Sequence, residues 1–110
     1  MNEQRRAPRK RPNYVVTVTD TISGQSLGQL GNLSSNGMLL ISPHRPRSEA
    51  VYQVSVPLPA LDGSMPTIEV GIQEQWHEPA ATPGQIWSGF RIIAIGSNDA
   101  AQLERWLQQG

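Results

Sequence analysis

Apolar and polar residues alternate along most of the chain, which is the pattern of half-buried β-strands. Six segments alternate in this way or are continuously apolar, and turn-forming residues separate them. The segments cover residues 14–19, 25–33, 38–41, 51–56, 67–76 and 86–95. Short strands with turns at a spacing of roughly 8–12 residues predict an all-β barrel or sandwich.

The last segment of the chain changes from a strand period to a helical one. Apolar residues fall on one face of a predicted helix that begins near residue 97, and Ser97 or Asn98 is expected to cap it. A single helix cannot bury its apolar face alone, so we expect it to close one end of the barrel. The face comprises Ala100, Leu103, Trp106 and Leu107. The other large aromatic residues, Trp76, Trp87 and Phe90, are also expected in the core or at a barrel end.

The length of 110 residues predicts one domain with three parts. These are a basic arm (1–12), a barrel (13–96) and a closing helix (97–110). The chain has no cysteine, which excludes disulfides and thiolate metal sites. No apolar run reaches the roughly 18 residues of a membrane span, and no apolar segment of a secretion signal follows the basic arm. We therefore expect a cytoplasmic protein that does not bind membranes.

The formal net charge of zero hides an asymmetry between the arm and the body. The arm holds five basic residues and one acid, a balance of +4, whereas the rest of the chain holds four basic residues and eight acids. A basic arm on an acidic body indicates a local anion site or an arm that rests on its own body. Long duplex DNA is disfavoured, because it needs phosphate contacts spread over a whole face. We expect the arm to be extended and mobile without a ligand, with Lys10 and Arg11 contributing only long-range charge.

Two short motifs are candidates for an anion site. Arg5 and Arg9 are four residues apart in the arm, and guanidinium groups bind phosphates bidentately and match the O6/N7 edge of guanine. The polar turn at residues 32–37 lies between two apolar runs. Its Asn32 amide offers a donor and an acceptor, its Ser34 hydroxyl can do either, and Gly37 permits positive φ and close backbone approach. Each motif alone has a plain alternative, a solvated tail or an ordinary β-turn.

Together the two motifs resemble the signature of bacterial PilZ domains, which is RxxxR followed by [D/N]xSxxG. Arg5 to Arg9 match the first part, and Asn32 to Gly37 match the second. The apolar strand after the turn, Trp76, the Gly89-Phe90 pair and the closing helix are also similar to the family. The resemblance implies a six-stranded antiparallel PilZ-type β-barrel with a C-terminal α-helix closing one end and an extended N-terminal arm.

The resemblance also implies a non-enzymatic receptor for the second messenger cyclic di-GMP, which orders the arm and signals to a downstream partner protein. In the family, the RxxxR arginines hold phosphates and guanine edges, which implies this role for Arg5 and Arg9, with Arg6 as a helper. The second motif contacts a guanine and shapes the turn, which implies these roles for Asn32, Ser34 and Gly37. Asn32 offers one neutral acceptor where an aspartate would offer a charged pair, which weakens the expected affinity. The sequence leaves open whether one or two ligand molecules bind to the site.

Two other functions remain as alternatives. A small barrel with a basic arm can bind single-stranded nucleic acid, although few aromatic residues are available for stacking and the body is acidic. A PilZ-like fold can also act as a protein-interaction adaptor without a nucleotide. We expect no metal site, because His44 and His77 are far apart in sequence and no cysteine accompanies them. We expect no catalytic residues, since the acidic residues are scattered singly along the chain and form no obvious catalytic pair.

Overall fold

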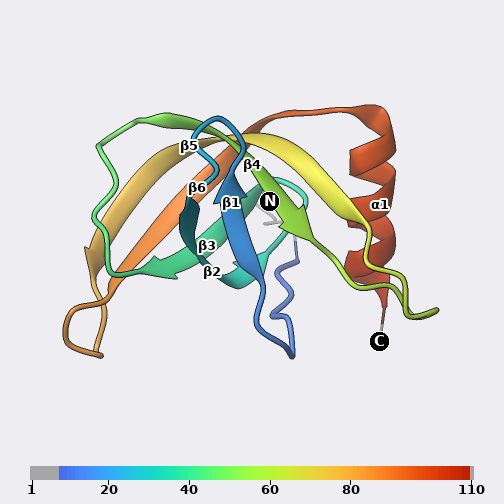
Figure 1. Ribbon diagram of the computed structural model, residues 1–110, viewed down its shortest axis with the longest axis horizontal. Helices are drawn as coiled ribbons and strands as arrows, with labels where there is room; N and C mark the ends of the chain where they lie inside the picture. Colours follow the sequence, from blue (N-terminus) through green and yellow to red (C-terminus); the bar gives the residue numbers. More distant parts are fainter. Residues whose placement is uncertain (1–7, 110) are drawn as a thin grey trace, which may run out of the picture.

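The described residues of the computed structural model, 8–109, fold into six strands and one helix (Figure 1). The strands form a closed barrel in the order β1-β2-β3-β6-β5-β4, and every neighbouring pair is antiparallel. The all-β barrel with a C-terminal helix predicted from the sequence is confirmed. The elements are β1 (Thr17–Asp20), β2 (Ser26–Leu33), β3 (Gly37–Ser42), β4 (Val51–Pro57), β5 (Thr67–Pro79), β6 (Ile86–Ile95) and α1 (Ser97–Gln108).

The core lies inside the barrel and follows from the alternation of each strand. In β4, Val54 and Val56 are fully buried, while Gln53 is exposed to solvent. Aliphatic residues of β5 fill the interior in the same way. The buried apolar side chains are Val16, Val18, Leu30, Leu33, Met38, Leu40, Val54, Val56, Leu58, Ile68, Val70, Ile72, Phe90, Leu103 and Trp106.

Strand β5 contains a β-bulge that changes which side of the barrel its residues face. The register with β6 shifts between Glu74 and Trp76. Before the bulge, even-numbered residues face the interior, and Glu74 is still buried. After it, Trp76 is 46% exposed. The expectation that Trp76 packs in the core is therefore wrong, because the extra residue of a bulge re-aims the side chains that follow.

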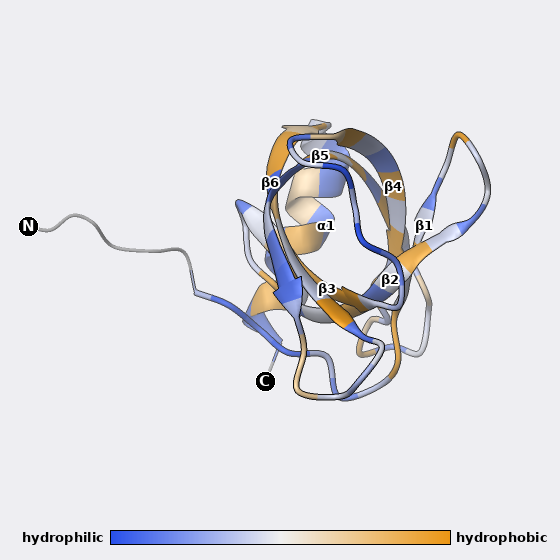
Figure 2. Ribbon diagram, turned by 90° about the vertical axis from the view of Figure 1, so that its left-hand side faces the viewer, coloured by the Kyte–Doolittle hydropathy of each residue, from blue (hydrophilic) through white to orange (hydrophobic). Residues whose placement is uncertain are grey.

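Helix α1 closes one end of the barrel, as Figure 2 shows in a view in which the helix lies at the far end. Leu103 and Trp106 are buried in the core, as predicted. The expected capping by Ser97 or Asn98 is wrong. Because β6 ends at Ile95, only Gly96 lies between strand and helix, and this residue is the N-cap without a side-chain bond. No helix in residues 8–109 is long and apolar enough to cross a membrane.

The described part of the arm is held against the barrel and the helix. The backbone of Lys10 pairs with Leu33 through hydrogen bonds of 2.9 and 3.0 Å. Lys10 Nζ donates to the carbonyl oxygens of Trp106 and Gln109 and lies 4.3 Å from the centroid of the Trp106 ring. Lys10 thus binds the C-terminal end of α1, where a cation is favoured by the helix dipole. The expectation that Lys10 lacks a specific contact is wrong.

Candidate functional site

A pocket of about 510 Å³ lies where the arm, the turn after β2 and strands β5 and β6 meet. It contains residues of both sequence motifs together with residues that neither motif includes. Its lining consists of Arg9, Asn32, Asn36, Gly37, Met38, Leu39, Gln75, Trp76, Gly89, Phe90 and Arg91. The barrel thus brings residues from the arm, the turn and the last two strands to one place.

A hydrogen bond joins the two motifs across 23 positions of sequence. Arg9 Nη1 donates to Asn32 Oδ1 over 2.8 Å. The backbone pairing of Lys10 with Leu33 places the two residues side by side. Asn32 has one side-chain acceptor oxygen, and Arg9 occupies it. The acceptor expected to face a ligand is therefore bonded within the protein.

Ser34 lies beneath the turn and holds its shape. Its side chain is 1% exposed, and its hydroxyl oxygen accepts hydrogen bonds from the backbone N–H groups of Asn36 (3.3 Å) and Gly37 (3.2 Å). The hydroxyl lies 2.9 Å from Asn36 Oδ1, to which it donates. These bonds form the side-chain-to-backbone pattern typical of serine in turns. Ser34 does not line the pocket, so its geometry fits the shaping of the turn.

Gly37 is required by a close approach between strands. Its φ is not positive, unlike those of Gly24, Gly28, Gly63 and Gly84. A Cβ atom at this position would lie 2.7 Å from the carbonyl oxygen of Phe90 in β6. Gly37 pairs with Arg91 in the same ladder. A glycine here therefore lets β3 begin against β6, which matches the expected close backbone approach and not the positive φ.

Trp76 and Gly89 form a flat wall of the pocket. They are paired across β5 and β6, and a Cβ atom on Gly89 would lie 2.3 Å from Trp76 Nε1. The indole therefore lies against the bare backbone of Gly89. An aromatic ring over a cross-strand glycine is a recurrent way to fill the space that the missing side chain leaves. The sequence did contain a signal for this pair, a glycine and a tryptophan in adjacent strands.

The pocket is electrically positive. Arg9 and Arg91 are both exposed on it, and among its described lining residues there is no carboxylate. Arg91 Nη2 lies 3.4 Å from Gln73 Oε1, a weak bond that leaves most of its donors available. Two guanidinium groups without a nearby acid favour an anionic ligand. Sequence reasoning missed Arg91, which stands alone in a strand.

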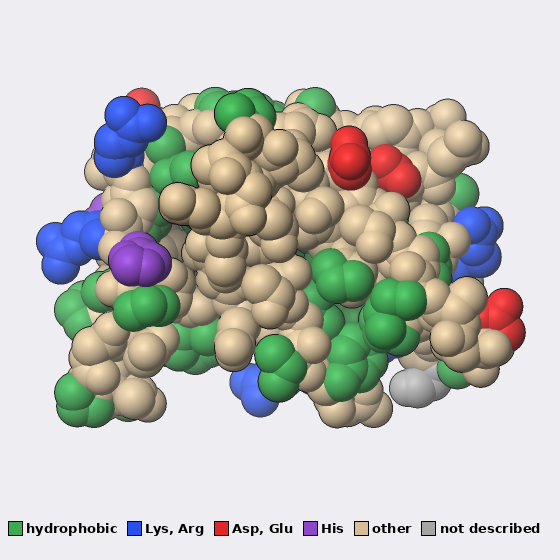
Figure 3. Space-filling view, in the orientation of Figure 1, with side chains coloured by type: hydrophobic (Ala, Val, Ile, Leu, Met, Phe, Trp, Pro, Cys, Tyr) green, Lys and Arg blue, Asp and Glu red, His purple; other side chains and the backbone are tan. Residues whose placement is uncertain are grey.

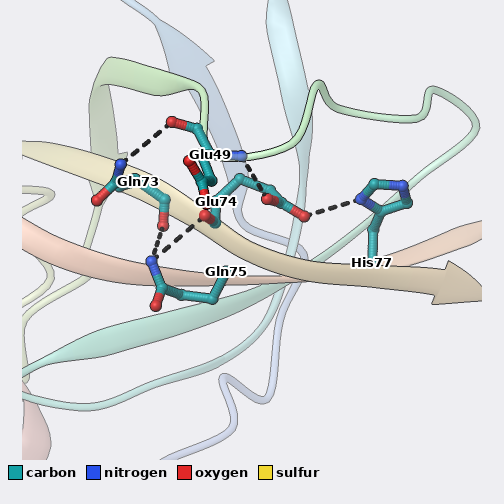
Figure 4. Close-up of polar contacts among 5 residues, drawn as sticks. All are labelled: Glu49, Gln73, Glu74, Gln75 and His77. Carbon is teal, nitrogen blue, oxygen red and sulfur yellow. Dashed lines mark hydrogen bonds and ion pairs between the residues drawn. The ribbon is translucent and has the colours of Figure 1, made fainter.

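A buried carboxylate fixes β5 next to the bulge (Figure 4). Glu74 is 2% exposed, and its oxygens lie 2.7 Å from the backbone nitrogen of Glu49 and 2.8 Å from His77 Nδ1. The hydrogen bond from Glu49 N–H, together with the bond from His77, holds the pKa of Glu74 below its ordinary value despite burial. Glu49 has a φ of 63°, which is uncommon for a residue with a side chain. The carboxylate thus holds the loop before β4 against β5.

Comparison with known families identifies the chain. The family model described as PilZ domain matches residues 3–109. The chain belongs to the PilZ domain family. This confirms the resemblance seen in the two motifs.

A structural neighbour agrees with the PilZ fold. The structure of Bacillus subtilis inhibitor of motility (MotI/DgrA) superimposes with a TM-score of 0.75 at 14% sequence identity. The match covers 97% of this chain and 51% of that chain, so this PilZ domain spans about half the length of its neighbour. No curated protein matches the chain in sequence.

PilZ domains form a family that binds cyclic di-GMP, acts as adaptors and is generally non-enzymatic. In this PilZ domain, three predicted site residues line the pocket, namely Arg9, Asn32 and Gly37. Ser34 lies behind it, and Arg5 and Arg6 lie outside the described residues. Within residues 8–109, no group of three His, Cys, Asp or Glu residues could hold a metal ion.

Proposed function

We propose that this PilZ domain is a receptor for cyclic di-GMP and that the ligand occupies the pocket between the arm, the turn and β5–β6. The observation that carries the proposal is the Arg9–Asn32 hydrogen bond, which unites the two halves of the family signature at the rim of a positive pocket. The ligand is a dianion with two guanine bases. It needs fixed cations for its phosphates and flat or polar surfaces for its bases.

The phosphates are bound by arginine in this proposal. Arg9 and Arg91 line the pocket from the arm and from β6, and Arg5 and Arg6 join them through the signature motif. Charge-assisted bonds from guanidinium to phosphate are shorter and about twice as strong as neutral hydrogen bonds. The number of these bonds determines the affinity for the ligand, because each bond offsets part of the conformational entropy that the arm loses on binding.

One guanine stacks on Trp76. Its indole rests on Gly89 and is 46% exposed, so the ring offers a face to a base without having to be uncovered first. Stacking of a base on an aromatic side chain contributes about 1–3 kcal/mol. Asn32 and Asn36 offer amide groups to the edge of the same or the second base.

Binding exchanges the partners of Arg9. In the protein alone, Arg9 donates to Asn32 Oδ1. A phosphate attracts the guanidinium more strongly than a neutral amide does, so Arg9 turns to the ligand and Asn32 Oδ1 becomes available to guanine N–H donors. One internal hydrogen bond is lost and two bonds to the ligand are gained.

The signal leaves the site through Lys10. This residue follows Arg9 directly and is bonded to the last carbonyl oxygens of α1 and stacked on Trp106. A shift of Arg9 toward a ligand therefore acts on the end of the helix, where a partner protein can detect the change. Because Lys10 already pairs with Leu33, its ordering adds no cost on binding.

Calorimetry with cyclic di-GMP tests the proposal. Arg9→Ala is expected to weaken binding at least about tenfold, since a lost charge-assisted bond costs about 1.5–3 kcal/mol. Arg47→Ala is the matched control, because Arg47 is an exposed arginine in the loop between β3 and β4 that lines neither this pocket nor any other described one. Absence of saturable binding by the unmodified chain, or equal affinities of the two variants, would overturn the proposal.

A further inference from the structure

A second pocket opens at the barrel end opposite α1. It has a volume of about 230 Å³ and is formed by the end of β1, the start of β2, the end of β3 and the starts of β4 and β6. Figure 2 looks into the barrel from this side, with α1 at the far end. Its lining consists of Asp20, Ser23, Gln25, Ser26, Leu27, Leu40, Ser42, His44, Arg45, Pro46, Tyr52, Ser88 and Phe90. It meets the pocket proposed for cyclic di-GMP, from here on called the nucleotide pocket, at Phe90, which lines both pockets.

Polar residues occupy interior positions at this end, whereas the helix end is filled by aliphatic residues and Trp106. Ser88 in β6 is 3% exposed, and its hydroxyl makes no hydrogen bond to another described residue. The Tyr52 hydroxyl likewise has no partner within residues 8–109, although its ring packs edge-on against Phe90 at 6.0 Å. Buried polar groups are normally hydrogen-bonded, so an unpartnered hydroxyl facing a cavity indicates a ligand or water.

The lining of this pocket carries one arginine and one carboxylate. Arg45 lines the pocket, is exposed, and forms no ion pair with another described residue. The one carboxylate of the lining, Asp20, has Oδ1 engaged by the backbone N–H groups of Ile22 (2.8 Å) and Ser23 (3.2 Å). Figure 3 shows cationic and histidine side chains gathered at the end of the molecule away from α1.

We propose that this pocket is a second binding site, for a small organic carboxylate with a short apolar portion. The carboxylate accepts from Arg45 and from the Ser88 and Tyr52 hydroxyl groups, which have no side-chain hydrogen bond within residues 8–109. The apolar portion packs between Leu27, Leu40 and Phe90. The volume of about 230 Å³ lies below the roughly 300–1,000 Å³ of sites for drug-sized ligands, which restricts the ligand to a small molecule of about the size of benzoate. The buried Glu74 carboxylate, paired with Phe90 in the neighbouring strand, does not line this pocket and is already bonded to Glu49 and His77.

Water is the competing occupant. A polar cavity of this size accommodates roughly seven water molecules at about 30 Å³ each, and water would also satisfy Ser88. The charge of a probe molecule distinguishes a carboxylate site from a pocket that holds only water. A carboxylate site binds an anion more tightly than an uncharged molecule of the same shape, whereas a water-filled pocket shows no such preference. The proposal does not depend on cyclic di-GMP, since the residues that bind the carboxylate lie outside the nucleotide pocket.

The test is an NMR titration of the whole chain with benzoate, benzamide and benzylamine. Benzoate is expected to shift the backbone amide signals of Ser42, Tyr52 and Ser88 in a saturable manner, and benzamide and benzylamine to bind at least about fivefold more weakly. Equal responses to benzoate and benzamide, or no saturable shift with benzoate, would show that the pocket holds water only and would overturn the proposal.

Three variants locate the site. Arg45→Gln is expected to weaken benzoate binding about threefold to tenfold, while Arg47→Gln in the same loop leaves it unchanged. Ser88→Val fills the cavity and removes the hydroxyl, so benzoate binding should be lost. If valine at position 88 disturbs folding, Ser88→Ala replaces it as the test. Alanine removes the hydroxyl without filling the cavity, so it should weaken benzoate binding. All of these variants should bind cyclic di-GMP as the unmodified chain does. An unchanged benzoate affinity in both Arg45→Gln and Ser88→Ala would place the ligand elsewhere and overturn the assignment.

Discussion

Arg9 Nη1 lies 2.8 Å from Asn32 Oδ1, so the two halves of the PilZ signature are bonded to each other within this protein. The bond uses one of the five N–H donors of Arg9 and the one side-chain acceptor oxygen of Asn32. The bond arranges the site, because it holds Arg9 at the rim of the pocket. In the proposed binding mode it also competes with the ligand, because Arg9 exchanges Asn32 for a phosphate. A substitution of Asn32 therefore changes both the bond to Arg9 and the proposed contact with the ligand.

Asn32→Asp is expected to raise the affinity for cyclic di-GMP about fivefold to tenfold. A carboxylate has two acceptor oxygens, so one can stay with Arg9 while the other accepts from guanine, and both bonds are charge-assisted. Isothermal calorimetry measures the change. Asn36→Asp is the matched control, because it adds the same charge to the same pocket at a residue whose amide oxygen already accepts from Ser34. It should weaken binding, and equal effects of the two substitutions would contradict the assigned role of Asn32.

Trp76→Ala is expected to weaken cyclic di-GMP binding about fivefold to a hundredfold, the range expected for loss of one stacked base. The fold should survive, because the indole is half exposed and lies outside the core. Trp76→Phe keeps a smaller aromatic face and should give an intermediate affinity. If ligand binding quenches tryptophan fluorescence equally in the unmodified chain and in Trp76→Phe, the base does not stack on this residue.

Gly89→Ala and Gly37→Ala are expected to separate binding from folding. The new methyl group at position 89 meets the Trp76 ring, which can swing away, so affinity should fall with little change in stability. The methyl group at position 37 meets the Phe90 carbonyl oxygen, which is fixed in the sheet, so the free energy of unfolding should fall by about 1–3 kcal/mol. Urea denaturation and calorimetry measure the two effects. In a Trp76→Ala background, Gly89→Ala should cause no further loss of affinity, and a large additional loss would show that the glycine acts in another way.

The barrel and its closing helix were predictable because their pattern is local. Alternation in β4 and the apolar face of α1 follow directly from the periods of strands and helices. The strand limits were less accurate. β1 begins at Thr17 although the alternation begins at Tyr14, whose hydroxyl accepts from Trp106 Nε1 at 2.8 Å. That bond to α1 joins residues 92 positions apart, and no local pattern contains it.

The site was predictable only where the family signature covered it. Trp76 was misplaced because the even-numbered residues of β5 face inward as far as Glu74, and an unbroken strand would bury Trp76 too. The bulge that turns it outward depends on pairing with β6, which a single sequence does not reveal. Arg91 was missed because it enters the pocket only when β3 and β6 pair, which places it opposite Gly37.

Lys10→Met is expected to lower the free energy of unfolding by about 1–2 kcal/mol and to loosen the end of α1. The substitution keeps an apolar stem but removes the ammonium that binds the Trp106 and Gln109 carbonyl oxygens, which then lose their capping cation. Urea denaturation measures the stability, and amide hydrogen exchange of the last helical turn measures the loosening. Arg11→Met, an adjacent exposed cation, is the control and should leave both unchanged. Equal effects of both substitutions would show that general charge, and not the helix contact, is responsible.

Glu74→Gln is expected to lower stability at pH 7 by about 1–3 kcal/mol and to flatten its dependence on acidic pH. The bond from Glu49 N–H holds the pKa of Glu74 below its ordinary value of 4.5, so the folded state favours the ionised form. This contribution is fully present above pH 4.5 and is lost as the pH falls through the lower pKa of the folded state. In urea denaturation from pH 3 to pH 8, the free energies of unfolding of Glu74→Gln and of the unmodified chain should therefore become equal at acidic pH. Glu78→Gln, an exposed carboxylate later in β5, should leave the profile of the unmodified chain unchanged. A constant difference between Glu74→Gln and the unmodified chain at every pH would show that Glu74 contributes through packing and not through its charge.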